Sequence, residues 1–172
     1  MEIEVRDGKI FATIDDIEHG LAVQIAMQRQ KYDENLENRK GSERSDLEIA
    51  IMGMCGEMIA ARLFDGKADL TSNFGGHPVA DIVLPNGQTV DVKTTYGGGD
   101  LNVNCGKKSK QCDYYLLIQQ LDQRGFQVVG YAEAYHVFQS PMLGEGKSAY
   151  YHVERKYLKA PWPLIRKRFH AE

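Results

Sequence analysis

The pattern of apolar and polar positions in the first part of the chain predicts a hairpin followed by a helix. Alternation over residues 2–13, interrupted at Asp7-Gly8, is typical of two short strands joined by a tight turn. A helix is predicted to begin at Asp15 or Asp16 and to run to about Asn38. Its apolar side is expected to hold Leu21, Ile25 and Leu36. Its later half is strongly polar, so Arg29 and Lys31 are interpreted as a solvated face rather than as contacts to a phosphate.

A second helix is predicted over about 46–64 by a capping box and a long apolar run. Ser45 and Glu48 have the spacing at which each side chain satisfies an amide of the other residue. Within the apolar run lies Glu57, a carboxylate among small and hydrophobic residues. A buried carboxylate is costly unless it is paired or binds a metal ion, which makes Glu57 a candidate site residue. The alternative is that its side chain reaches solvent at the helix edge.

The remaining pattern is mostly that of strands. A strand is plausible near 67–73, and the runs at 113–119 and 126–134 predict two buried strands. Shorter strands are predicted at 101–104 and 149–153, and residues 141–147 read as a loop. A last helix is expected to begin at Pro161-Trp-Pro163 and to end at Arg166–Arg168.

The most informative segment, residues 81–93, predicts a hairpin whose register follows from its turn. Pro85, Asn86 and Gly87 suit a type I turn followed by a left-handed glycine, which closes a three-residue loop. Ile82 then faces Val90. Because side chains alternate, one face is fully apolar, with Ala80, Ile82, Leu84, Val90 and Val92. A two-residue Asn86-Gly87 loop would mix apolar and polar residues on both faces.

The opposite face of this hairpin carries the candidate chemistry. In the predicted register Asp81 lies opposite Asp91, with Lys93 on the same face. Opposed like charges destabilise a hairpin, and local rules of this kind are often broken at functional sites. A bound divalent cation such as Mg²⁺ would turn the repulsion into coordination. The alternative is a strand edge that is merely decorated with charge.

Composition restricts the classes of protein that fit the chain. With 172 residues, 42% hydrophobic and 26% charged, the chain is expected to form one globular domain. Its parts would be a hairpin and helix over 1–44, a core over 45–135 and an extension over 136–172. No apolar run is long enough to cross a bilayer and the acidic start does not resemble a signal peptide, so a cytoplasmic location is expected. The three cysteines show no zinc-binding spacing and read as free thiols.

The net charge of −3 argues mildly against a general nucleic-acid coat, but basic residues gather in two places. Six basic residues accompany one glutamate between 154 and 170, and a second cluster lies at 107–110. Local patches rather than the total charge make phosphate contacts. The candidates for binding nucleic acid are Lys107, Lys108, Lys110, Arg166, Lys167 and Arg168.

Taken together, a helix glutamate, an aspartate, a hairpin and an Asp-x-Lys strand resemble the PD-(D/E)xK nuclease superfamily. The matching residues are Glu57, Asp81, Asp91 and Lys93, and the resemblance covers about residues 45–120. Pro78 lies three residues before the first aspartate rather than next to it. The order of helix, strand, hairpin and strand looks like the core of restriction endonucleases and Holliday-junction resolvases. Several small phage or mobile-element members are similar in size.

The resemblance implies an α/β fold, of the α+β class with a mixed sheet, and a restriction-endonuclease-like core in which helices flank the central sheet. It implies a Mg²⁺-dependent deoxyribonuclease, with Mn²⁺ able to substitute, in which Asp81, Asp91, the Val92 carbonyl and Glu57 bind the metal. Lys93 would orient the attacking water and offset charge in the transition state. The chain departs from the family at 97–112, where a helix is usual and the sequence is rich in glycine.

Two other functions stay open at this point. One is a catalytically inactive nucleic-acid-binding module of the same fold. The other is a protein-interaction domain with an incidental charged hairpin, to which exposed tyrosines such as Tyr150 and Tyr151 would contribute. DNA is the partner expected from the nuclease interpretation. The sequence leaves open whether the chain forms a homodimer and whether cleavage is internal or at ends.

Overall fold

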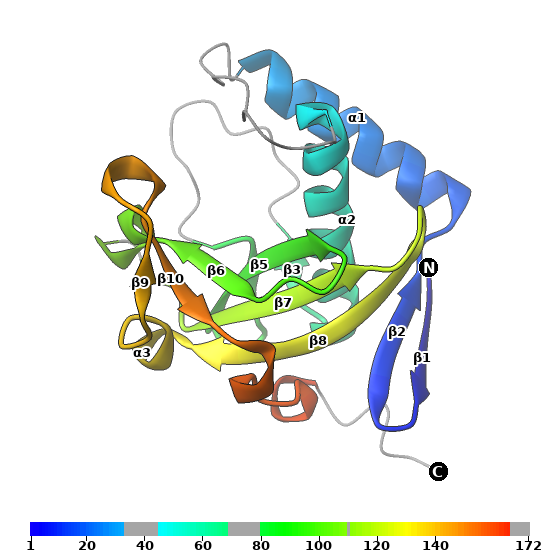
Figure 1. The fold of residues 1–172 in the computed structure, drawn as a ribbon. Coiled ribbons are helices and arrows are strands. Elements are labelled where there is room, and N and C mark those ends of the chain that lie inside the picture. Colours follow the sequence, from blue (N-terminus) through cyan, green and yellow to red (C-terminus); the bar gives the residue numbers. More distant parts are fainter. Residues whose placement is uncertain (33–44, 69–79, 110, 166–172) are drawn as a thin grey trace.

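The computed structural model describes residues 1–32, 45–68, 80–109 and 111–165 (Figure 1). The two long helices are α1 (Asp16–Tyr32) and α2 (Asp46–Phe64), and a short α3 (Ala134–Val137) follows later. The strands are β1 (Glu2–Arg6), β2 (Lys9–Thr13), β3 (Lys67–Ala68), β4 (Ile82–Val83), β5 (Thr89–Tyr96), β6 (Leu101–Asn104), β7 (Tyr114–Gln120), β8 (Gly125–Glu133), β9 (Met142–Leu143) and β10 (Tyr150–Val153). Short 3₁₀ turns are η1 (Cys105–Ser109), η2 (Gly146–Ser148), η3 (Arg155–Tyr157) and η4 (Trp162–Leu164).

The ten strands within the described residues form two sheets. The larger is mixed, with the order β1-β2-β8-β7-β5-β4-β3, and its β5–β7 pair is parallel while its other pairs are antiparallel. The smaller sheet has the order β6-β10-β9. Because parallel neighbours need a crossover, the chain leaves the large sheet between β5 and β7, and β6 and η1 lie within that connection. The expected α+β class with a mixed sheet is confirmed.

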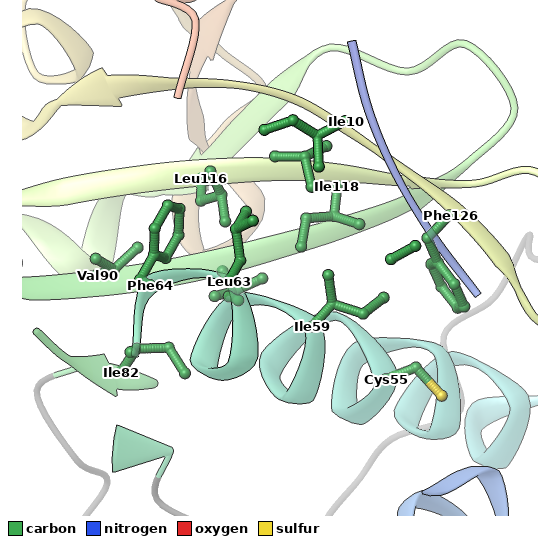
Figure 2. Close-up of a cluster of buried hydrophobic side chains, with 14 of the residues drawn as sticks. Ile10, Cys55, Ile59, Leu63, Phe64, Ile82, Val90, Leu116, Ile118 and Phe126 are labelled. Carbon is green, nitrogen blue, oxygen red and sulfur yellow. The ribbon is translucent and has the colours of Figure 1, made fainter. Parts of the chain in front are cut away.

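Helix α2 begins and ends as the sequence predicts. The Ser45 hydroxyl accepts a hydrogen bond from the Glu48 amide at 3.2 Å, and the Glu48 carboxylate accepts one from the Ser45 amide at 2.7 Å. Figure 2 shows the apolar side of α2 turned toward the large sheet. Ile59 and Phe64 pack there against Leu116, Ile118 and other strand residues, all of them buried. This contact fixes α2 against the centre of the sheet.

The opposite face of the large sheet is covered by the small sheet and α3. Tyr115 and Leu117 of β7 pack there with Leu101 of β6, Val137 of α3 and Val153 of β10. Among the described elements, both long helices therefore lie on one side, with α1 crossing α2 (Figure 1). The expectation that helices flank the sheet is met by α1 and α2 on one face, whereas the described part of the other face carries the short α3 beside the small sheet. Short strands replace the second helical layer because residues 97–112 carry no helical apolar period.

Several smaller predictions need correction. In α1 the buried positions are Ala22, Ile25 and Ala26, whereas Leu21 is 40% exposed. Residues 141–147, expected to be a loop, contain β9, which pairs with β10. Tyr150 and Tyr151 are half-buried rather than exposed, because β10 is the middle strand of the small sheet. Leu36 and Asn38 lie outside the described residues, as do most of the strand expected at 67–73 and the end of the last expected helix.

The last expected helix is represented in the described residues by the 3₁₀ turn η4. No described helix is long and apolar enough to span a membrane.

Candidate functional site

The register of the 81–93 hairpin is the one predicted from its turn. The Gly87 amide donates to the Leu84 carbonyl at 2.9 Å, and the Leu84 amide donates to the Gln88 carbonyl at 2.8 Å. Gly87 has φ of +85°, a conformation that glycine adopts without strain. Ile82 pairs with Val90. The three-residue loop is therefore confirmed, and the two-residue alternative is wrong.

The two faces of the hairpin separate as expected. The five residues of its apolar face are all at least 92% buried, and those of β4 and β5 pack in the core beside α2. On the opposite face the Lys93 ammonium contacts the Asp91 carboxylate directly. Asp91 is completely buried, whereas the Lys93 side chain is 30% exposed. Because an isolated buried carboxylate is strongly disfavoured, Lys93 is the cation that makes the burial of Asp91 tolerable.

Asp81 lies where β4 separates from β5. The regular ladder ends at Ile82, so Asp81 and Asp91 are not a ladder pair, which corrects the predicted opposition. The Asp81 amide donates to the Val90 carbonyl at 3.1 Å. The Asp81 carboxylate accepts a hydrogen bond from the Val92 amide at 2.7 Å. The Asp81 side chain thus satisfies the Val92 amide, as a neighbouring strand would do, and its carboxylate lies beside the backbone of β5 between Asp91 and Lys93.

Glu57 approaches β5 from the side of α2. At Gly56 the helix lies so close to the strand that an added Cβ would be 2.0 Å from the Thr94 hydroxyl oxygen. The Glu57 side chain is only 12% exposed, so the alternative that it reaches solvent is wrong. Asp91 and Lys93 project to the other face of β5, since Val92 and Thr94 face α2. The candidate residues therefore meet around the edge of β5 rather than on one flat face.

Arg29 of α1 completes this group of charges. Its Nη1 donates to both carboxylate oxygens of Glu57, at 3.1 Å each. The sequence interpretation of Arg29 as part of a solvated face is wrong. The signal was present in the spacing, because Arg29 follows the buried Ala22, Ile25 and Ala26 at seven, four and three residues on one helix face. The candidate site is defined here as Arg29, Glu57, Asp81, Asp91 and Lys93.

The electrostatics of Glu57 link the members of the candidate site. Burial, and after it the negative charge of Asp81, raise the pKa of Glu57 from 4.5 to about 7 in all. Arg29 and Lys93 act on this pKa in the opposite direction, but they do not outweigh burial and Asp81. Ion pairing with arginine usually keeps a glutamate fully ionised. Here the fold keeps the Glu57 carboxylate near the Asp81 carboxylate, although this makes ionisation of Glu57 less favourable.

The donor set of the candidate site suits a hard divalent cation, although the site is not preassembled. Its possible ligands are carboxylate and carbonyl oxygens, which Mg²⁺ prefers, and a cation would relieve the repulsion between Glu57 and Asp81. Within the described part of the chain, no group of three or more His, Cys, Asp or Glu residues is arranged to hold a metal ion. Arg29 contacts both carboxylate oxygens of Glu57 and Lys93 contacts Oδ1 of Asp91, and such an ion would compete with both cations for these oxygens.

Few of the predicted phosphate-binding residues fall within the described structure. Lys108 lies in η1 and is exposed, with its ammonium 5.9 Å from the centre of the Tyr151 ring. Lys107 also belongs to η1. Lys110, Arg166, Lys167 and Arg168 lie outside the described residues. The three cysteines are free thiols, as expected.

A second polar group, which the sequence did not predict, lies beyond the end of β5. The Arg155 amide donates to Asp100 at 2.9 Å, its Nε donates to the Gly99 carbonyl at 2.7 Å, and its Nη2 donates to the Gln119 side chain at 2.8 Å. The His152 ring lies 2.9 Å from Asn102 Oδ1 and 3.5 Å from Asp100. We call these residues the Arg155 cluster, defined as Asp100, Asn102, Gln119, His152 and Arg155.

Comparison with known proteins gives one match. The model of a family of unknown function, DUF5843, matches residues 6–132, a range that contains the whole candidate site and ends before His152 and Arg155. No curated protein and no solved structure matches the chain. The matched range covers well over half of the 172 residues. The chain therefore belongs to the DUF5843 family.

Proposed function

We propose that the protein is a metal-dependent nuclease that hydrolyses phosphodiester bonds of DNA. The observation that carries this proposal is the confirmed register of the 81–93 hairpin, which brings Asp81 to the backbone beside the Asp91–Lys93 pair. Glu57 joins them from α2 and is electrostatically linked to both Asp81 and Lys93. Three carboxylates grouped about one strand, one of them paired with an amine, match the chemistry of metal-assisted phosphodiester hydrolysis.

The order of elements supports a restriction-endonuclease-like core. Helix α2 is followed by β3, the β4–β5 hairpin and β7, and β5 pairs with β7 in parallel. This is the order of helix, strand, hairpin and strand in the PD-(D/E)xK superfamily that the sequence resembles. The crossover between β5 and β7 contains β6 and η1 instead of the usual helix. Assignment to that superfamily is accordingly part of the proposal.

In this proposal the residues of the candidate site have separate roles. Glu57, Asp81, Asp91 and the Val92 carbonyl would hold Mg²⁺, or Mn²⁺ in its place. When bound, the cation supplies Lewis-acid polarisation of the phosphate and lowers the pKa of a coordinated water. The Lys93 ammonium, partly exposed at the site, would orient the attacking water and offset negative charge on the phosphate in the transition state. Asp81, through its bond to Val92, holds the strand backbone in place.

A cleavage assay tests the proposal. The protein is incubated with linear, circular and branched DNA in Mg²⁺, in Mn²⁺ and in excess chelator, beside Asp91→Ala and Lys93→Ala. We expect metal-dependent cleavage of at least one DNA form and its loss in both variants. Glu154 and Lys156 provide a matched control. They also form an ion pair between residues two apart, with 2.8 Å between Nζ and the carboxylate oxygen, but both side chains are exposed. Lys156→Ala should retain full activity.

Other outcomes separate the alternatives. Binding of DNA without cleavage in any metal would reject the enzyme and favour an inactive nucleic-acid-binding module. If the protein neither binds nor cleaves DNA, the protein-interaction domain is the alternative that remains. Cleavage that persists in Asp91→Ala would show that the activity arises from another site or from a contaminant, and would reject the proposed site.

A further inference from the structure

The contact between Arg29 and Glu57 has an unusual form. A guanidinium commonly binds a carboxylate through two parallel hydrogen bonds from two nitrogens. Here the single Nη1 serves both oxygens of Glu57. The Arg29 side chain is 35% exposed and that of Glu57 12%. Arg29 is therefore the more solvent-exposed partner of this ion pair.

The same contact conflicts with metal binding by Glu57. Both Glu57 oxygens accept from Nη1, so a cation that binds this carboxylate has to displace the guanidinium or share its oxygens. Sharing would hold two positive groups about one carboxylate at short range, where repulsion is strong in a partly buried site. Displacement is the outcome that electrostatics favour. The arginine then stays beside the site, because it is anchored to α1.

The formal charges show what the displaced arginine would do. Three carboxylates and two cationic side chains give the candidate site a charge of −1 when all are ionised. A divalent cation changes this to +1, which a phosphodiester group of charge −1 would neutralise. Without Arg29, the site holding a divalent cation would have no net charge and a weaker attraction for the phosphate. An arginine is also well suited to phosphate oxygens through its fixed planar donors.

We propose that Arg29 is a phosphate-binding residue of the candidate site, held on Glu57 until a divalent cation takes its place. The cation and the guanidinium would exchange: the cation takes Glu57, and Arg29 takes a non-bridging oxygen of the DNA phosphate. This inference rests on the proposed nuclease function. It predicts that loss of Arg29 changes metal binding and DNA binding in opposite directions, which a purely structural role would not do.

The first part of the test measures metal binding without DNA. Mn²⁺ is titrated calorimetrically into the wild-type protein, Arg29→Met and Arg29→Lys. We expect Arg29→Met to bind Mn²⁺ about three- to tenfold more tightly, because the competitor for Glu57 is gone. Arg29→Lys keeps a positive charge and should lie between the two. Arg124→Ala is the control, since Arg124 pairs with Asp16 at the other end of α1 and its loss removes the same charge.

The second part measures the Michaelis constant for DNA at saturating Mg²⁺. We expect Arg29→Met to raise KM about tenfold with a smaller change in kcat, and Arg29→Lys to restore part of the loss. Arg124→Ala should match the wild type in both measurements. Weaker Mn²⁺ binding together with a higher KM in Arg29→Met would show a structural role and overturn the inference while leaving the nuclease proposal intact.

Failure of the nuclease proposal looks different. A wild-type protein that binds Mn²⁺ but cleaves no DNA rejects the proposed function and with it the phosphate-binding role, while tighter Mn²⁺ binding in Arg29→Met would still support the competition for Glu57. A wild-type protein that binds no Mn²⁺ overturns both proposals. Unchanged Mn²⁺ affinity in Arg29→Met, with binding intact, overturns the inference alone.

Discussion

The candidate site, around the middle of β5, and the Arg155 cluster, beyond the end of that strand, differ in how their charges are arranged. In the candidate site, the negative charge of Asp81 disfavours ionisation of Glu57 beyond the effect of burial, although Arg29 and Lys93 form ion pairs there. In the Arg155 cluster, the Arg155 amide donates to Asp100, and its guanidinium donates to the neutral acceptors of Gly99 and Gln119. The first group keeps two carboxylates near each other, whereas the second places each donor against its own acceptor.

The comparison suggests how to separate function from structure in this fold. A satisfied network such as the Arg155 cluster joins the segment after β5 to the small sheet and stabilises that connection. Carboxylates held together at a cost need another reason to persist, and binding of a cation supplies one.

The largest effect is expected from Asp91→Asn, which keeps the shape of the side chain but removes its charge. Cleavage of DNA in Mg²⁺ should fall by about 10³-fold or more, because both a proposed metal ligand and the partner of Lys93 are lost. Single-turnover rates on the best DNA substrate measure this. Asp100→Asn, in the Arg155 cluster, is the matched carboxylate and should change the rate little. An equal loss of cleavage rate in Asp91→Asn and Asp100→Asn would contradict the view that only the candidate site takes part in the reaction.

A stability effect without a catalytic one is expected from Arg155→Met. Loss of side-chain bonds to Gly99 and Gln119 leaves acceptors unsatisfied and should lower the free energy of unfolding by about 2–4 kcal/mol. Urea denaturation measures the change, and kcat of the folded fraction should stay within about twofold of the wild type. A large fall in kcat with intact folding would mean that the Arg155 cluster takes part in the reaction.

Gly56→Ala should disturb the approach of α2 to β5. The added methyl group would overlap the Thr94 hydroxyl, which is buried and has no hydrogen-bond partner among the described residues. We expect a loss of about 1–3 kcal/mol in the free energy of unfolding and lower activity, because Glu57 follows directly. In Gly53→Ala the methyl group meets nothing within 4 Å, so this helix variant should be slightly stabilised. Thr94→Ala combined with Gly56→Ala should recover part of the loss.

The last expected effect is a pH dependence of stability due to Glu57. Its pKa is about 7 in the folded protein against an ordinary 4.5, so between these values the folded state binds more protons than the unfolded state. This contribution therefore lowers stability as the pH rises through that window, by on the order of 3 kcal/mol. Glu57→Gln should remove it. Urea denaturation at about pH 5 and about pH 8 compares the two proteins, and identical pH dependence would contradict the burial argument.

The sequence could predict the hairpin because its information is local. Pro85, Asn86 and Gly87 determine the loop, and alternation then assigns each side chain to a face. Glu57 stood out in the helix pattern as an acidic residue in an apolar run, and its place beside Asp81 and Asp91 was expected from the resemblance to the PD-(D/E)xK superfamily. Its closeness to β5 depends on Gly56 and Thr94, which lie far apart in the chain and meet only after α2 packs on the sheet.

The sequence analysis missed the ion pair of Arg29 and the Arg155 cluster for a related reason. In α1 the predicted Ile25 is buried, but the other buried positions are the small residues Ala22 and Ala26, whereas the predicted Leu21 is exposed. The small sheet joins β6 to β10 across about fifty residues, and β9 has only two residues. Such short strands carry little pattern of their own, because pairing across a long separation decides their structure.

The central claim, that Glu57, Asp81 and Asp91 together bind a divalent cation, is tested most directly by calorimetric titration of Mn²⁺ without DNA. This measurement does not depend on which form of DNA is cleaved. We predict saturable binding to the wild-type protein that is weakened at least about tenfold in Asp81→Asn and unchanged in the exposed Glu154→Gln. No saturable binding to the wild type, or equal binding by Asp81→Asn, would contradict the account.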